Sequence, residues 1–94
     1  MSKRSIERKL AKGSKRLQAL RDDLVAIDEQ LRSLRDDADD TAIRAMVADN
    51  TAADREARQA REHAAAHERQ RERVAAEIAE LEQRQDELLD ELMS

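Results

Sequence analysis

The 94-residue chain contains no cysteine, no proline and no aromatic residue, and its single glycine is Gly13. The lack of cysteine excludes disulfides and thiol chemistry. Without aromatic side chains, so short a chain has little volume with which to fill a globular core. Few helix breakers and a charged fraction of 43% are together typical of a long helix or coiled coil.

Long hydrophobic runs are also missing. No segment approaches the ~20 consecutive apolar residues that a membrane span needs, and the first ten residues lack the apolar stretch of a secretory signal. We therefore expect a cytoplasmic location and no membrane partner. Arginine outnumbers lysine by 14 to 4, and this bias, with abundant alanine, favours a GC-rich bacterial source.

The features that catalysis requires are absent as well. The sequence shows no pairing of a nucleophile with a base and no glycine-rich phosphate loop. Two paired helices offer no pocket that excludes water. We expect a protein that is not an enzyme and that needs no cofactor.

What the chain does contain is a heptad repeat in each half. Ten of twelve repeat positions are apolar in the first half and nine of twelve in the second. Because 39% of the chain is apolar, about nine of the twenty-four would be apolar by chance, so nineteen indicates a coiled-coil seam. The seam positions are 6, 10, 13, 17, 20, 24, 27, 31, 34, 38, 41 and 45, then 53, 57, 60, 64, 67, 71, 74, 78, 81, 85, 88 and 92.

The two repeats mirror each other about Asp49, so seam positions pair when their numbers sum to 98. This symmetry predicts an all-α fold: a long antiparallel two-helix coiled-coil hairpin, forming one domain over 1–94. Its helices are expected at about 5–48 and 52–93, with a turn at about 49–51. In this register Leu17 faces Leu81 and Ala38 faces Ala60.

The turn itself is predicted from local residue types. Asp49 and Asn50 favour a turn, and Thr51 followed by Asp54 predicts a capping box at the start of the second helix. An alternative turn at 36–40, where four of five residues are aspartate, leaves much of the second seam unpaired. We prefer the turn at 49–51 and leave open a kink at 36–40.

Charge also favours antiparallel pairing. Residues 3–21 hold eight basic and one acidic side chain, whereas residues 77–94 hold seven acidic and one basic, so the acidic segment should compensate the basic one. The flanking pairs are mixed, since Lys9 is expected near Glu91 but Arg16 near Arg84. Exposed pairs contribute only tenths of a kcal/mol, so the leucine layers must set the register.

Three seam positions carry large polar side chains: His67, Arg71 and Gln85. Polar residues in a seam fix register or oligomeric state at some cost in stability, and this is the role we expect for them. His63 and His67 have the H-x3-H spacing of metal ligands, but two ligands on one helix do not make a site. No metal is expected.

Two helices leave part of their seam exposed to water, so we expect a homodimer, a four-helix bundle or docking on another protein. Apolar residues outside the seam are candidate partner contacts: Ile43, Met46 and Val47 beside the turn, and Leu89 and Met93 near the chain end. Alternatively, the heptad frame shifts locally and tucks the first three inward. The leading prediction is a small protein–protein interaction or scaffolding module.

A basic arm at the start of the chain supports a second hypothesis. It includes Lys9, Lys12 and Arg16, and Gly13 could loosen it from the hairpin; fraying of residues 1–12 is left open. Such arms neutralise phosphates, so nucleic-acid binding is an alternative function. The net charge of -4 and the lack of aromatic residues that stack on bases disfavour it.

An acidic stretch supports a third hypothesis. Residues 36–54 carry six aspartates against one arginine, and Asp37, Asp40 and Ala42 match an Asp-x-x-Asp-x-Ala signature. In this the chain resembles the Gre and DksA type transcription factors, whose antiparallel coiled coils insert an acidic tip into the secondary channel of bacterial RNA polymerase. The resemblance implies an acidic-tip role for Asp37 and Asp40, holding Mg²⁺ near a partner's active site. The globular domain and zinc cysteines of those families are missing from this sequence.

Overall fold

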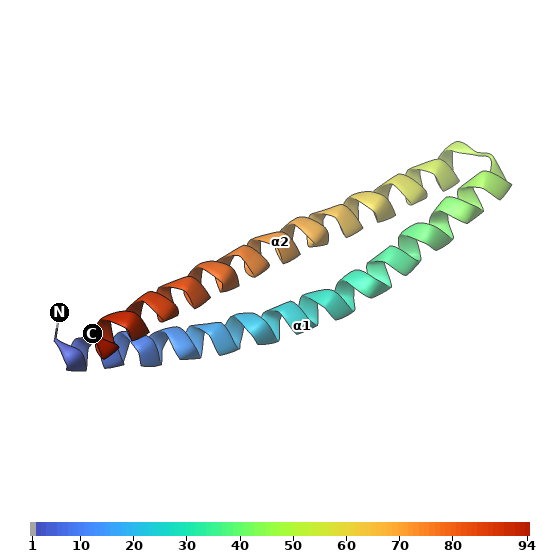
Figure 1. Ribbon diagram of the computed structural model, residues 1–94. Helices are drawn as coiled ribbons and strands as arrows, with labels where there is room; N and C mark the ends of the chain where they lie inside the picture. The colour runs from blue at the N-terminus through green and yellow to red at the C-terminus, as the bar shows by residue number, and fades with distance from the viewer. Residues whose placement is uncertain (1) are drawn as a thin grey trace. The chain divides into compact units, whose positions relative to one another are not determined.

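The computed structural model describes residues 2–94, and it is all-α (Figure 1). Helix α1 spans Lys3–Ala48, helix α2 spans Thr51–Met93, and Asp49 and Asn50 connect them. Residues 2–94 contain no strand. The predicted all-α helical hairpin is confirmed.

Helix α1 begins earlier than the heptad pattern alone indicates, because Ser2 caps it. The Ser5 backbone N–H donates to Ser2 Oγ at 3.2 Å, and the Ile6 N–H donates to the Ser2 carbonyl at 3.1 Å. Ser is a preferred N-cap residue for this reason. Residues 3–12 are helical and Ile6 is buried, so the basic arm is part of α1 rather than a frayed segment.

The turn uses Asp49 and Asn50, as expected, but the capping residue differs from the prediction. Asp49 has a left-handed backbone (φ 50°), and its N–H donates to the Ala45 carbonyl at 3.1 Å. Asn50 Oδ1 accepts from the Ala53 N–H at 2.8 Å. Asn50 is therefore the N-cap of α2 and Thr51 its first helical residue, so the capping box predicted from Thr51 is wrong.

The seam is where the heptads place it. All twenty-four seam positions are buried or half-buried, whereas only six of the other described residues are not exposed. Thr41, a polar seam residue, is buried with its hydroxyl donating to the Asp37 carbonyl at 2.8 Å. Helix α1 runs unbroken through 36–40.

The chain forms two compact units, each built from both helices. We call Met1–Leu24 with Arg73–Ser94 the terminal unit and Val25–Glu72 the turn unit. In the terminal unit the first and last segments of the chain lie side by side and run in opposite directions (Figure 1). The terminal core is a buried cluster of Leu17, Leu20 and Ile78 against which Leu24, Val74 and Leu81 pack.

These six residues form three layers, and in each layer the two residue numbers sum to 98, as the heptads predict. The terminal unit therefore has the predicted register. In the turn unit the most buried residues are Ile27, Leu31 and Ala57, all of them seam positions. The turn unit thus uses smaller seam residues on α2 than the terminal unit does.

The flanking ion pairs correct the expected ones. In the terminal unit Arg16 Nη2 lies 3.0 Å from Glu77 Oε1, and Arg84 Nη1 lies 3.2 Å from Glu87 Oε2, so Arg16 and Arg84 each pair with a carboxylate. Arg16 reaches a carboxylate of α2 about two turns from Arg84, whereas Arg84 pairs with a carboxylate of its own helix. All these side chains are about half exposed, so each pair contributes at most about 1 kcal/mol.

Candidate functional site

Three apolar side chains stand exposed beside the turn. Ile43, Met46 and Val47 are 57%, 77% and 83% exposed, and their i, i+3, i+4 spacing places them on one side of α1. We call them the tip patch. The heptad frame does not shift here, because the seam positions Thr41 and Ala45 stay buried and half-buried. The alternative in which the three residues tuck inward is therefore wrong.

The tip patch has the chemistry of a contact surface. Full burial of a side chain of this size stabilises a complex by about 1.5 to 3 kcal/mol. Asp49, Asp54, Arg58 and Arg61 line a depression with Met46, and Arg44 Nη2 donates to Asp40 Oδ2 at 3.1 Å within α1. Within the described residues none of these charges forms an ion pair between the helices. A partner with an apolar surface could therefore cover the tip patch without first breaking an ion pair between the helices.

Asp37 and Asp40, the candidate acidic tip, are exposed on α1 about two to three turns before its end. Asp40 pairs with Arg44, while Asp37 contributes its backbone carbonyl to Thr41. Residues 2–94 hold no group of three or more His, Cys, Asp or Glu residues arranged to bind a metal. The two carboxylates are exposed charge without a built cation site.

His63 and His67 contact each other rather than a shared ligand. Their ring centroids lie 5.2 Å apart with the planes at 77°, and His67 Nδ1 lies 3.3 Å from the His63 carbonyl oxygen. His67 is half-buried in the seam and His63 is exposed. His67 therefore occupies the seam position that the heptads give it, and its role in fixing register stays a prediction.

Arg71 is the other large polar seam residue of the turn unit. Its Nε donates to Asp28 Oδ1 at 2.5 Å. This hydrogen bond, with the attraction of the same carboxylate, raises the pKa of Arg71 above its ordinary value. The turn unit therefore carries a permanently charged residue at a seam position.

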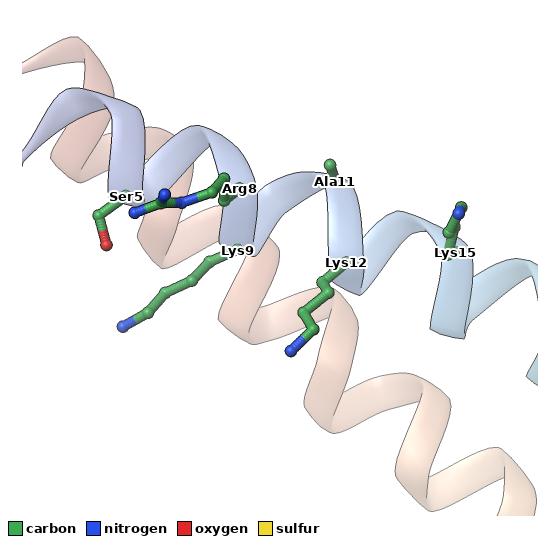
Figure 2. A pocket seen from close by; sticks show the side chains of 6 residues that line it. All are labelled: Ser5, Arg8, Lys9, Ala11, Lys12 and Lys15. Atoms are coloured by element: carbon green, nitrogen blue, oxygen red, sulfur yellow. The ribbon is translucent and has the colours of Figure 1, made fainter.

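The basic arm lies along one helix. Figure 2 shows a depression lined by Ser5, Arg8, Lys9, Ala11, Lys12 and Lys15, all of which project from α1. The cationic groups point in different directions and do not converge on one place (Figure 2). Within the described chain none of these four cations forms an ion pair, so the acidic segment does not compensate them by direct contact.

A more structured site lies where Gly13 meets Gln85. The Gln85 amide crosses the seam, and its Nε2 donates to the Leu10 carbonyl at 2.9 Å. A Cβ at Gly13 would lie only 2.7 Å from Gln85 Cδ. Gly13 therefore leaves room for Gln85, and α1 continues through it without loosening the arm.

Over this pair lies an open groove of about 460 Å³. Its lining combines Leu81 and Leu88 with four cationic side chains, and we call it the cationic groove: Lys9, Lys12, Gly13, Arg16, Leu81, Arg84, Gln85 and Leu88. The sequence pairs Gly13 with Gln85 and predicts Arg16 near Arg84, but it does not show that these side chains line one groove with Lys9, Lys12 and Leu81. That grouping requires the side-chain directions on both helices.

The other two candidate partner contacts, Leu89 and Met93, lie on α2 in the terminal unit. They are 43% and 83% exposed. Asp86 and Asp90 are exposed on the same side of the helix, at i, i+3, i+4, i+7 spacing with the apolar pair. We call Asp86, Leu89, Asp90 and Met93 the acidic edge.

Comparisons with protein-family models, curated proteins and solved structures found no match to this chain. The resemblance to the Gre and DksA type therefore rests on Asp37, Asp40 and Ala42. Across residues 2–94, neither helix has a segment apolar enough to cross a membrane.

Proposed function

We propose that this chain is a non-catalytic protein–protein interaction module and that it binds a partner protein through the tip patch. The observation that supports this is the exposure of Ile43, Met46 and Val47 beside a seam already filled by alanines. Single exposed apolar residues are ordinary, whereas a contiguous group marks a contact surface.

The spacing of the tip patch suggests how the partner is recognised. Three apolar side chains at i, i+3 and i+4 on a helix are the anchors of helix-in-groove recognition. The partner would therefore offer an apolar groove that receives the last turns of α1. Binding of this kind depends weakly on salt, because the contact is apolar.

Photocrosslinking in cells tests this proposal. A photoreactive amino acid replaces Met46 in one variant and Val25 in the other; Val25 is an off-seam apolar residue, 60% exposed, in the same turn unit. We expect one discrete protein adduct from position 46 and none from position 25. Adding Val47→Asp should remove the adduct, because a charge is costly in an apolar groove.

Adducts of equal yield from positions 46 and 25 would contradict the proposal, since both residues would then report random encounters. So would an adduct at position 46 that survives Val47→Asp. Circular dichroism of each variant confirms that the helices persist, which is expected because neither position belongs to the seam.

A further inference from the structure

The cationic groove holds charge that its own chain leaves unneutralised. Arg16 and Arg84 form ion pairs with Glu77 and Glu87. Within the described residues Lys9 and Lys12 form none. Two free ammonium groups therefore border a floor made of the half-buried Leu81 and the aliphatic stems of the basic side chains, with Leu88 buried beneath it.

The acidic edge carries the complementary chemistry. Leu89 and Met93 expose apolar surface, and within residues 2–94 the flanking Asp86 and Asp90 form no ion pair. Carboxylates and apolar groups alternate along one side of α2, so the acidic edge offers both negative charge and apolar surface.

The edge cannot reach the groove of its own chain. Both surfaces use α2, and at about 100° per residue the edge faces a direction about 140° around the helix from the groove residues. The groove residues of α2 are Leu81, Arg84, Gln85 and Leu88. Only another molecule can bring the two surfaces together.

We infer that the acidic edge of a second copy of this chain occupies the cationic groove. In this contact Asp86 and Asp90 of one copy lie against Lys9 and Lys12 of the other, while Leu89 and Met93 cover the apolar floor. Because the two surfaces face different directions, the contact is head to tail, and it extends to further copies as concentration rises. This contact is separate from the tip patch and does not depend on its function.

A phosphate polymer fits the groove less well than the acidic edge. A nucleic-acid backbone supplies negative charge but nothing apolar to cover Leu81 and the aliphatic stems, and the cations along α1 do not converge (Figure 2). A second copy satisfies both the charged rim and the apolar floor. Binding of nucleic acid in the groove is a competing outcome of the experiment.

Analytical ultracentrifugation of the whole chain tests the inference. At about 0.01 M salt, where charges interact over about 30 Å, we expect the average mass to rise above 10.7 kDa with protein concentration. At about 1 M salt, where this range falls to about 3 Å, the association should weaken at least tenfold.

Two variants each remove one side of the contact. Lys9→Glu with Lys12→Glu removes the groove, and Leu89→Asp removes the edge, so each variant alone should stay monomeric. An equimolar mixture should form a dimer and nothing larger, because the first variant keeps only an intact edge and the second only an intact groove. Arg8→Glu with Lys15→Glu is the matched control: it makes the same charge change on α1 outside the groove and should associate as wild type does.

Several outcomes would overturn the inference. A wild-type chain that is monomeric at every concentration in low salt is one, and a Lys9→Glu, Lys12→Glu variant that still associates is another. A third is a short DNA duplex that binds the monomer through Lys9 and Lys12 while no self-association occurs. Met46→Asp should leave the self-association unchanged. Failure of the self-association and failure of partner binding through the tip patch can therefore be told apart.

Discussion

Gln85 of α2 occupies the space that a side chain at Gly13 of α1 would fill, and it hydrogen-bonds to the Leu10 carbonyl across the seam. Glycine inside a helix is usually about 1 kcal/mol less stable than alanine. Here the destabilising conformational freedom of Gly13 is offset by the contact with Gln85 that the missing side chain permits. The two positions should therefore be energetically coupled.

A double-mutant cycle measures this coupling. Gly13→Ala alone should fail to stabilise the chain, because the new Cβ displaces Gln85 from its hydrogen bond. In a Gln85→Ala background the same change should raise the free energy of unfolding by about 1 kcal/mol. Equal gains in both backgrounds, measured by urea unfolding, would mean that Gly13 and Gln85 are independent.

Stability should be concentrated in the leucine layers of the terminal unit. Leu20 is 2% exposed within this cluster, so Leu20→Ala should lower the free energy of unfolding by about 2 to 5 kcal/mol. Val25→Ala removes a similar side chain that is largely exposed and should change it by no more than about 0.5 kcal/mol. Similar losses in both variants would show that the seam does not carry the stability.

The register and the turn were accessible from the sequence because both depend on local patterns. The heptads locate Leu17 and Leu81 in one layer, and two turn-forming residues at 49 and 50 end the first pattern. The cap was misplaced by one residue, since Asn50 and Thr51 are both good capping residues and only the backbone geometry decides between them.

The candidate surfaces were less predictable, because they depend on where side chains point. Ile43, Met46 and Val47 could be identified as off-seam, but the heptads could not show whether they turn inward. Arg16 pairs with Glu77, about two turns from the expected neighbour Arg84, since a long side chain samples several partners. The cationic groove combines residues of both helices that no sequence window contains.

Arg71 should cost stability relative to an apolar residue. Its ion pair with Asp28 is more than a third exposed, so water screens it and it stabilises the chain only weakly. Arg71→Leu should therefore raise the free energy of unfolding, since an apolar side chain is better suited to a half-buried seam position. A loss of stability instead would show that the Arg71 pair outweighs apolar packing.

The pH dependence of the Arg71–Asp28 pair follows from the direction in which the pKa of Arg71 is shifted. Because Asp28 raises the pKa of Arg71 in the folded chain, the contribution of Arg71 is present below the ordinary arginine pKa and is lost only as pH rises through the higher folded value. The effect of Arg71→Leu should accordingly be the same at pH 7 and pH 9.

Cysteine pairs test the antiparallel register directly. Leu17→Cys with Leu81→Cys, and Ala38→Cys with Ala60→Cys, should crosslink within one chain when a short thiol-reactive linker is added to dilute protein. Leu17→Cys with Leu88→Cys, which is shifted by one heptad, is the control and should react much more slowly. Crosslinks found only between chains would contradict the intramolecular hairpin.

The affinity of the partner captured at position 46 tests the central claim, that binding occurs through the apolar tip patch. Calorimetry would compare Met46→Asp, Asp37→Asn with Asp40→Asn, and the triple change Lys9→Gln, Lys12→Gln and Arg16→Gln. We predict that only Met46→Asp weakens binding, by tenfold or more, which is about 1.4 kcal/mol. Wild-type affinity in Met46→Asp would contradict the account: a loss in the aspartate variant would then favour an acidic-tip regulator, and a loss in the triple variant would favour a nucleic-acid binder.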